Sequence, residues 1–232
     1  MPVPYPAELR ERAVRLVIEA RQNPVTRDGA ITRIAKQLDL LPETVRKWVR
    51  RAEIDEGIRP GTTAEGLAKL KPSFLPEGKV TAGNSSQICD GASAALIMSA
   101  DKAAALGLTP RARFHTFALA GVDPVRMLTG PIPATAKALE KSGLGIDDFD
   151  HIEVNEAFAS VVLAWEKEHH PDMAKVNANG GAIALGHPLG GSGTKLMATM
   201  LNELERIGGR YGLQTMCEGG GMANATVIER LG

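Results

Sequence analysis

The fold is decided by residues 177–221, which read NANGGAIALGHPLGGSGTKLMATMLNELERIGGRYGLQTMCEGGG. The first seventeen of these residues hold six glycines and predict a loop of tight turns. Apolar residues then recur at helical spacing as far as Ile207. A strand-like run at 212–217 follows and ends at three more glycines. A loop, a helix and a strand in this order indicate part of a layered α/β domain.

The same alternation extends over the chain after residue 90. Strand patterns alternate there with helix patterns, which predicts a mixed sheet with helices packed against it. The predicted strands are 94–98, 113–120, 151–154, 212–217 and 223–229, and the predicted helices are 100–106, 134–142, 156–168 and 192–207.

His187 lies in the glycine-rich loop, just before the predicted helix. An imidazole in that position could polarise an oxygen or accept a proton near neutral pH. Two simpler interpretations stay open, because glycine spacings are weak signals. The loop could serve chain reversal alone, or it could bind a phosphate without any chemistry.

Cys217 ends one predicted strand, and Asn155 directly follows another. The glycine amides after Cys217 could bind a thioester oxyanion, and we expect them to make this thiol more acidic than Cys89. The alternative for Cys217 is a buried structural cysteine. The carboxamide of Asn155 could orient a water molecule, or it could cap the helix predicted from Glu156.

Three segments, taken in order, resemble the C-terminal signatures of the thiolase family, which comprises acetyl-CoA acetyltransferases and 3-ketoacyl-CoA thiolases. The segments are NEAFA at 155–159, NGGAIALGHP at 179–188 and CEGGG at 217–221. Further matches lie at 80–92 and 130–134, so the resemblance covers roughly residues 66 to 232. It implies a thiolase C-terminal half-domain, with a mixed sheet and helices.

The resemblance also implies roles for individual residues. His187 would activate the nucleophile and help to form an oxyanion hole with a water held by Asn155. Cys217 would exchange the proton on the attacking carbon, and the amide of Gly219 would contribute to a second oxyanion hole.

The substrate follows from the same resemblance. Acyl-CoA or coenzyme A would be the ligand, with no further cofactor, and Ala157 and Phe158 would line the channel for the acyl-pantetheine group.

The chain departs from the thiolase pattern in one essential part. Thiolases carry an acylated cysteine in a Cys-Gly-Ser-Gly type context, and nothing here matches it. Cys89 stands where the family usually has a serine or asparagine, and we interpret it as a substitution in a structural turn. Most of the N-terminal half-domain and the loop domain that grips coenzyme A are also missing. We therefore expect an inactive fragment whose uncovered half-domain face leads to self-association as a homo-oligomer.

The first 52 residues predict a different, all-helical module. Helices are predicted at 6–21, 31–38 and 43–51, with a tight turn before the basic third helix. This order is that of a helix-turn-helix, and the segment resembles the N-terminal DNA-binding part of insertion-sequence transposases of the small two-frame type. Trp48 is expected in the core. The alternative is a solvated basic helix in a three-helix bundle. The candidate DNA contacts are Thr44, Arg46, Lys47 and Arg50.

Charge divides the chain in the same way. The whole sequence is neutral, with 27 basic and 27 acidic residues, but residues 1–52 hold 11 Lys or Arg against 6 Asp or Glu. The predicted organisation is a transposase-like segment at 1–52, a junction at 53–78 and a thiolase C-terminal domain at 79–232. Weak binding of the first segment to duplex DNA is expected.

Two functional classes follow, a thiolase-type C-acyltransferase or its remnant, and a DNA-binding protein that carries the α/β domain as a passenger. The two cysteines lie in separate motifs, which favours a reducing cytoplasm. No apolar run approaches the roughly 18 residues that a membrane-spanning helix needs, so no membrane partner is expected. His169 and His170 are interpreted as exposed surface, and no metal site is predicted.

Overall fold

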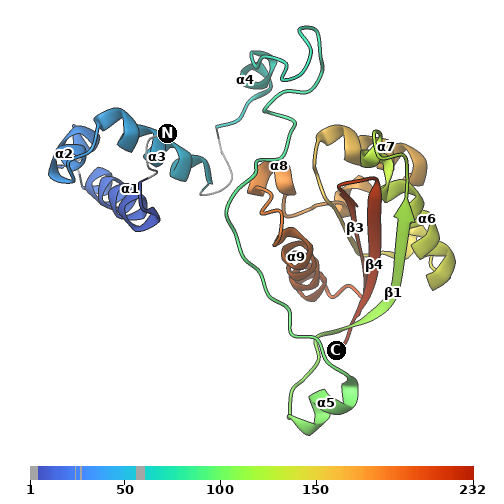
Figure 1. The fold of residues 1–232 in the computed structure, drawn as a ribbon. Coiled ribbons are helices and arrows are strands. Elements are labelled where there is room, and N and C mark those ends of the chain that lie inside the picture. Colours follow the sequence, from blue (N-terminus) through green and yellow to red (C-terminus); the bar gives the residue numbers. More distant parts are fainter. Residues whose placement is uncertain (1–4, 24, 27, 56–60) are drawn as a thin grey trace. The chain divides into compact units, whose positions relative to one another are not determined.

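The computed structural model describes residues 5–23, 25–26, 28–55 and 61–232. The chain forms two compact units, Met1–Ile58 and Arg59–Gly232 (Figure 1). Each unit has its own hydrophobic core, and each is described by itself below. Among the described residues, no helix is both long and apolar enough to cross a membrane.

The first unit consists of helices α1 (Ala7–Gln22), α2 (Ala30–Gln37) and α3 (Pro42–Asp55). Proline starts α3 because its fixed φ suits a first helical turn and its missing N–H is not needed there. Asp39 has a φ of 53° in the turn between α2 and α3. The helices predicted at 6–21, 31–38 and 43–51 are therefore present. Their buried core is formed by Ala13, Val17, Ala30, Ile34, Ala35, Leu40, Val45 and Val49.

The second unit contains a mixed sheet, as the sequence predicted, but with four strands instead of the five predicted. Its strand order is β1-β4-β3-β2, in which only β2 and β3 run parallel. The glycines 219–221 join β3 to β4, and Gly220 and Gly221 have positive φ values of 78° and 83° that other residues rarely adopt. The strand bounds are β1 Ala112–Gly121, β2 His151–Val154, β3 Tyr211–Glu218 and β4 Met222–Arg230.

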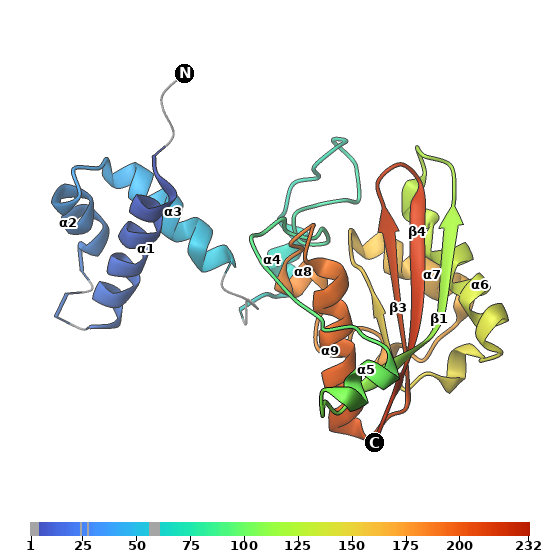
Figure 2. The same ribbon diagram turned by 60° about the horizontal axis from the view of Figure 1, so that its bottom comes forward.

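Helices cover the two faces of this sheet (Figures 1 and 2). Helices α6 (Pro131–Ser142) and α7 (Ala159–His169) lie on one face, and α9 (Ser192–Ile207) lies on the other. The main core lies between α6, α7 and the sheet, around the fully buried Trp165. The Trp165 indole N–H donates to Thr135 Oγ1 at 2.9 Å, so this large side chain leaves no unpaired donor.

Residues 61–110 differ from this pattern. They contain only short helices, α4 (Ala64–Ala68) and α5 (Ala100–Ala105). The strand predicted at 94–98 is wrong, because this part of the chain is extended but pairs with no strand of the described structure. Leu96 and Ile97 are 81% and 63% exposed. The apolar pattern is that of a strand, but the neighbour that a strand needs is absent from the described residues.

Smaller differences have local causes. The helix predicted from residue 156 begins at Ala159, because Phe158 is extended and forms a bridge to Ser85. A short helix, α8 (Ala182–Leu185), interrupts the loop that was predicted to contain only turns. His169 is not exposed surface as expected, since its ring packs on Trp165 with centroids 5.4 Å apart. Single 3₁₀ turns lie at Met127–Thr129, Ile146–Asp148 and Met173–Lys175.

Candidate active site

The asparagine and cysteine motifs lie at the carboxyl ends of two neighbouring parallel strands. Val154 of β2 is in register with Thr215 of β3, and the Asn155 N–H donates to the Thr215 carbonyl at 3.0 Å. Cys217 follows two residues later on β3. Because parallel strands end at the same edge of a sheet, Asn155 and Cys217 belong to one end of this domain.

A short segment, residues 84–88, ties the asparagine motif to the histidine loop. We call it the 84–88 strap. It forms bridges to Phe158 on one side and to His187 on the other. The strap therefore fixes the distance between two motifs that lie about thirty residues apart in sequence. Its backbone bonds are Ala159 N–H to Asn84 O (2.9 Å), Ser86 N–H to Ala157 O (3.1 Å) and His187 N–H to Gln87 O (2.7 Å).

Asn155 is not the helix cap that remained open as an alternative. Helix α7 begins four residues later, and no side chain caps it. The Asn155 side chain is buried, with 1% exposure, and its Oδ1 has no hydrogen-bond partner among the residues that the structure describes. A buried amide oxygen without a partner is costly unless a water or a ligand completes it. This geometry suits an amide that orients a water.

The ring of His187 is held by one hydrogen bond to Ser192. His187 Nδ1 lies 2.6 Å from Ser192 Oγ, and the Ser192 hydroxyl donates to the Pro188 carbonyl at 3.0 Å. A hydroxyl has one proton and a carbonyl can only accept, so when the Ser192 proton lies on the Pro188 carbonyl, Nδ1 donates to Ser192. In that arrangement the imidazole Nε2 of the neutral ring is unprotonated. Burial, together with the positive charge of Lys195, lowers the pKa of His187 below its ordinary value, so the ring is a neutral base at pH 7.

Cys217 differs from the expectation of an acidic thiol. The side chain is half-buried, and burial raises the pKa of the Cys217 thiol above its ordinary value. The negative charge of Glu218 raises this pKa further. The protonated thiol is therefore favoured at neutral pH, which suits a group that gives a proton to carbon. A hydrogen bond to the Cys217 backbone lowers this pKa but does not outweigh the loss of water around the sulfur.

Gly219, Ala157 and Phe158 are the remaining predicted site residues of the thiolase part. Gly219 lies in the exposed turn directly after β3, and the space beside its Cα is open. Ala157 and Phe158 are half-buried next to the 84–88 strap. The Phe158 ring meets Phe74 edge-on, with centroids 6.2 Å apart.

Glu156 and Asn177 are functional candidates that the sequence analysis missed. The Glu156 carboxylate accepts from the Ile183 N–H at 2.9 Å and from Asn177 Nδ2 at 3.0 Å. Asn177 in turn binds both the N–H and the carbonyl of Val154, at 2.8 and 2.9 Å. A side chain at Gly181 would collide with the Glu156 carboxylate. Together these contacts hold the histidine loop against the asparagine motif.

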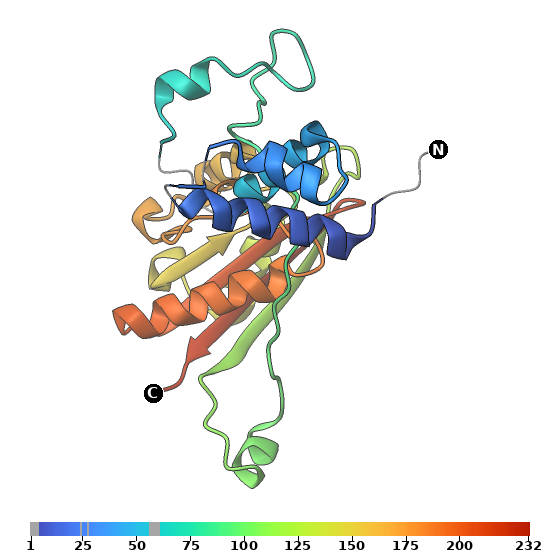
Figure 3. The same ribbon diagram turned by 90° about the vertical axis from the view of Figure 1, so that its left-hand side faces the viewer.

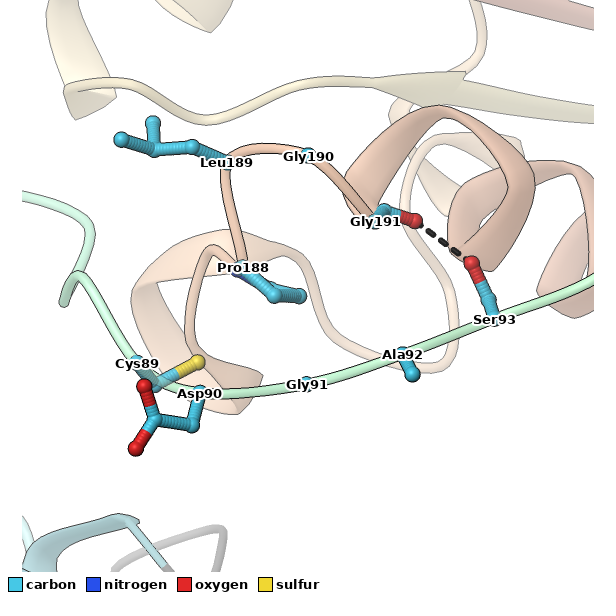
Figure 4. Close-up of a pocket in the computed structure, with 9 residues that line it drawn as sticks. All are labelled: Cys89, Asp90, Gly91, Ala92, Ser93, Pro188, Leu189, Gly190 and Gly191. Atoms are coloured by element: carbon cyan, nitrogen blue, oxygen red, sulfur yellow. Dashed lines mark hydrogen bonds between the residues drawn. The ribbon is translucent and has the colours of Figure 1, made fainter.

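A cavity of roughly 470 Å³ lies between residues 89–93 and residues 188–191 (Figure 4). The Cys89 sulfur points toward the 188–191 loop, whereas the Asp90 carboxylate points away from it. The Ser93 hydroxyl donates to the Gly191 carbonyl at 2.6 Å. Asn155, His187 and Cys217 are not among its lining residues, so this cavity adjoins the site without containing its candidate chemistry. In the described part of the chain, no three His, Cys, Asp or Glu residues are placed to hold a metal.

Comparison with known families decides what this arrangement is. The thiolase C-terminal domain matches residues 108–230, and the thiolase N-terminal domain matches residues 37–101. The first match alone covers more than half of the 232 residues. The chain belongs to the thiolase family. The thiolase N-terminal match begins at the last residue of α2, so it overlaps the segment 1–52 for which a transposase-like module was predicted.

Individual thiolases support this assignment. A steroid 3-ketoacyl-CoA thiolase of Mycobacterium tuberculosis is 62% identical over 178 residues, which are 77% of this chain and 43% of the relative. The crystal structure of the Bacillus anthracis acetyl-CoA acetyltransferase matches 76% of this chain and 45% of its own, with 46% identity and a TM-score of 0.74. The human mitochondrial 3-ketoacyl-CoA thiolase in complex with CoA matches 96% of this chain and 55% of its own, with 35% identity and a TM-score of 0.70.

These matches confirm the thiolase-like α/β fold with a mixed sheet. The chain spans about half the length of the relatives that it matches.

The thiolase part brings three predicted site residues to one end of the sheet. His187 is held by Ser192 in the first turn of α9, and Gly193 of the same turn packs near Met216, the neighbour of Cys217. Asn155 lies on the adjacent strand end.

The candidate DNA contacts lie in the other unit. Thr44 is half-buried, and Arg46 is exposed and ion-paired with Glu43. Trp48 packs against the helical core, as expected. The side chains of Lys47 and Arg50 lie outside the described residues.

Proposed function

We propose that the thiolase part carries the proton-transfer half of carbon–carbon acyl chemistry on coenzyme A thioesters. His187 Nε2 would act as the base, and Cys217 would exchange a proton with the carbon next to the thioester. Asn155 would hold a water at one oxyanion site, and the Gly219 amide would serve a second. The observation that carries this proposal is the chain of hydrogen bonds from His187 through Ser192 to Pro188, which leaves Nε2 free to accept a proton.

The substrate would be acyl-CoA or coenzyme A, with Ala157 and Phe158 along the acyl-pantetheine channel. Thiolases need no cofactor beyond this substrate. The relatives act on acetyl-CoA, on 3-ketoacyl-CoA or on its steroid form, as their names state.

We propose that the chain by itself does not complete the reaction. It has no second cysteine in a Cys-Gly-Ser-Gly type context to carry the acyl group, and retained acid–base groups do not replace a nucleophile. Acetoacetyl-CoA cleavage with free coenzyme A should stay at background at micromolar protein. Turnover that is lost in both Cys89→Ala and His187→Ala would contradict this and make Cys89 the nucleophile.

A partial reaction tests the proposed chemistry directly. Proton exchange at the methyl carbon of acetyl-CoA needs a base and a thiol but no acylated cysteine. Deuterium incorporation in D₂O, followed by NMR, should exceed background and fall to background in Cys217→Ala. Because the pKa of Cys217 is raised, exchange that requires the thiolate should speed up as pH increases. Exchange that is equal in Cys217→Ala and in the unchanged chain would refute the role of Cys217.

DNA binding by the first unit is a second candidate function. Three helices around a core, a net basic charge over residues 1–52 and the exposed Arg46 support it. Affinity would be weak and non-specific, on the order of 10⁻⁴ to 10⁻⁶ M at physiological salt. In fluorescence anisotropy with a labelled duplex, Arg46→Ala with Lys47→Ala should weaken binding by the full chain and flatten its salt dependence. An affinity that does not depend on salt concentration would contradict this proposal and favour a three-helix bundle without a DNA-binding role.

The organisation proposed for the chain is a helix-turn-helix segment at 1–52, a junction at 53–78 and a thiolase C-terminal domain at 79–232, joined as a fusion. We also propose a cytoplasmic location, in line with two unpaired cysteines. Phe117, Leu119 and Met222 form an exposed apolar face on β1 and β4, which we call the open sheet face. Self-association would use this surface.

A further inference from the structure

Two glutamates lie buried in the layer between the sheet and α9. Glu153 is on β2 and Glu203 is on α9, and each is at most 5% exposed. The Glu203 carboxylate accepts from two nitrogens of Arg206, at 2.6 and 2.8 Å, and from Asn179 Nδ2 at 2.9 Å. Glu153 Oε1 lies 2.8 Å from His151 Nε2, whereas Glu153 Oε2 has no partner among the described residues. Protein donors therefore stabilise an anion at Glu203 but reach only one oxygen of Glu153.

A second unpaired oxygen lies beside Glu153. The neighbours of Glu153 on β2 belong to the main core, so its own side chain points to the other face of the sheet, along which α9 runs (Figure 3). Gln214 is its register partner on β3 and faces the same side, since Gly212, two residues earlier, packs on α9. Gln214 Nε2 donates to Met216 Sδ at 3.4 Å, but Gln214 Oε1 is buried and unpaired within the described structure. Two acceptor oxygens without donors thus lie at paired positions on neighbouring strands.

One proton pairs both of these oxygens. An ionised Glu153 has acceptors only, so it leaves Gln214 Oε1 without a donor. A neutral Glu153 with its proton on Oε2 can donate to Gln214 Oε1, while its Oε1 accepts from His151 Nε2–H. Reversal of the Gln214 amide does not help, because its oxygen would then face the sulfur of Met216, which has no proton to donate. Since buried polar groups without partners are costly, the hydrogen bonds favour the neutral acid.

The surrounding charges are consistent with a neutral Glu153. Burial raises the pKa of Glu153 above its ordinary value, and the negative charge of Glu156 raises it further. His151 and Lys195 act in the opposite direction, but burial is the largest of these causes. The donors around Glu203, in contrast, lower the pKa of that carboxyl to about 2. The two buried glutamates are therefore expected to differ in charge at neutral pH.

The Glu153 side chain lies next to the candidate site. Asn155 follows it by two residues, and the Asn155 N–H donates to the carbonyl of Thr215, the residue after Gln214. A bond from Glu153 to Gln214 would join β2 to β3 just before the strand ends that carry Asn155 and Cys217. A neutral acid in this position also keeps a negative charge away from the site proposed for an oxyanion.

We propose that Glu153 is a neutral carboxylic acid at neutral pH, that it donates a hydrogen bond to Gln214 across the two parallel strands, and that it is a positioning residue for Asn155. The role of Asn155 rests on the proposed function. The protonation state of Glu153 and its bond to Gln214 do not.

NMR of the full chain tests the protonation state. With glutamates labelled with ¹³C at the carboxyl carbon, one signal should have the shift of a neutral acid at pH 7, and Glu153→Gln should remove it. The signal of Glu203, assigned with Glu203→Gln, should have the shift of a carboxylate and is the matched control. If every glutamate signal is that of a carboxylate at pH 7, the proposal is wrong, and Glu153 forms a buried ion pair with His151.

Two substitutions separate the neutral acid from the ion pair by stability. Glu153→Gln reproduces the neutral acid, because its carbonyl can accept from His151 and its amide can donate to Gln214. Its midpoint of urea unfolding should stay close to that of the unchanged chain. Glu153→Leu should lower the midpoint, because it leaves Gln214 unpaired. A Glu153→Gln chain that loses as much as Glu153→Leu, or that does not fold, would contradict the proposal, because loss of one partner of a buried ion pair is strongly destabilising.

The positioning role has a readout that does not need activity. The side-chain amide signals of Asn155 should keep their shifts in Glu153→Gln and change in Glu153→Leu. Unchanged signals in folded Glu153→Leu would overturn the positioning role.

Deuterium exchange into saturating acetyl-CoA connects the positioning role with the proposed chemistry. The rate should stay within about twofold in Glu153→Gln and fall about tenfold or more in Glu153→Leu, because a small misplacement of a site group is costly. Equal rates in the two variants would count against the positioning role. Absence of exchange in the unchanged chain would contradict the proposed function alone, since the carboxyl, urea and amide measurements decide on Glu153 without it.

Discussion

Residues 111–232 and residues 61–110 both match thiolases, but only the first set has a core. In 111–232 the apolar residues of β1–β4, α6 and α7 surround Trp165, and polar groups inside are mostly paired. In 61–110 the same kinds of residue face outward. The difference shows that an apolar sequence pattern is not enough to bury a segment such as 94–98, because a strand also needs a neighbouring strand to pair with. Family membership and self-sufficient folding are therefore separate properties of this chain.

The largest effect expected from this comparison is the loss of Trp165. Trp165→Ala removes a fully buried ring and its bond to Thr135, so the free energy of unfolding should fall by about 3–5 kcal/mol. Phe74→Ala removes a ring that is 70% exposed in the other region and should change stability by less than about 0.5 kcal/mol. Urea unfolding of the full chain measures both. Equal losses would mean that the two regions share one core.

A smaller effect is expected at the contact between the histidine loop and Glu156. Gly181→Ala places a methyl group on the Glu156 carboxylate, and relief of this overlap should cost about 1–3 kcal/mol. Gly190→Ala enters open space in the same loop and serves as the control. Thermal unfolding compares them. If the two variants unfold alike, Glu156 does not hold the loop.

The lowered pKa of His187 should have a still smaller effect, which is to make the free energy of unfolding depend on pH. Its folded-state pKa is lowered, so neutral His187 favours the folded protein above the unfolded-state pKa of about 6.5. That contribution is lost as pH falls from there through the folded-state pKa. An NMR titration should place the pKa of His187 below 6.5, with the proton of the neutral ring on Nδ1. Ser192→Ala should let the other tautomer appear, and an unchanged tautomer would refute the assignment.

The rate of Cys217 alkylation should change least. Because burial raises the pKa of its thiol, Cys217 should react with iodoacetamide more slowly in the folded chain than in urea. Peptide mass spectrometry of timed samples measures both rates. Faster labelling in the folded state would contradict the raised pKa and support the acidic thiol that was predicted from the neighbouring glycine amides.

The sequence predicted most of the fold in 111–232, since strands at 113–120, 151–154, 212–217 and 223–229 each match an observed strand within two residues at either end. It failed at 94–98, where the pattern describes side chains but not the missing neighbour. The late start of α7 could not be predicted from the sequence either, because the 84–88 strap that bridges Phe158 lies about seventy residues earlier.

At the site, the motifs gave Asn155, His187 and Cys217, but not the groups that hold them. Ser192 binds His187 from the next helix, and Glu156 reaches Ile183 across 27 positions. Such bonds leave no regular residue spacing in the sequence. The glutamate at 156 and the glycine at 181 are consistent with these bonds but do not predict them. The pKa of Cys217 depends on burial, which the sequence does not contain.

The most direct test of the contrast between the two regions is native-state amide hydrogen exchange of the full chain alone. Amides of β3 and β4 should exchange only through global unfolding, with opening free energies equal to that measured in urea. Amides of 94–98 should exchange at nearly the rate of an unstructured peptide. Protection of 94–98 equal to that of β3 would contradict the account, because it would show that residues 61–110 are already covered without a partner.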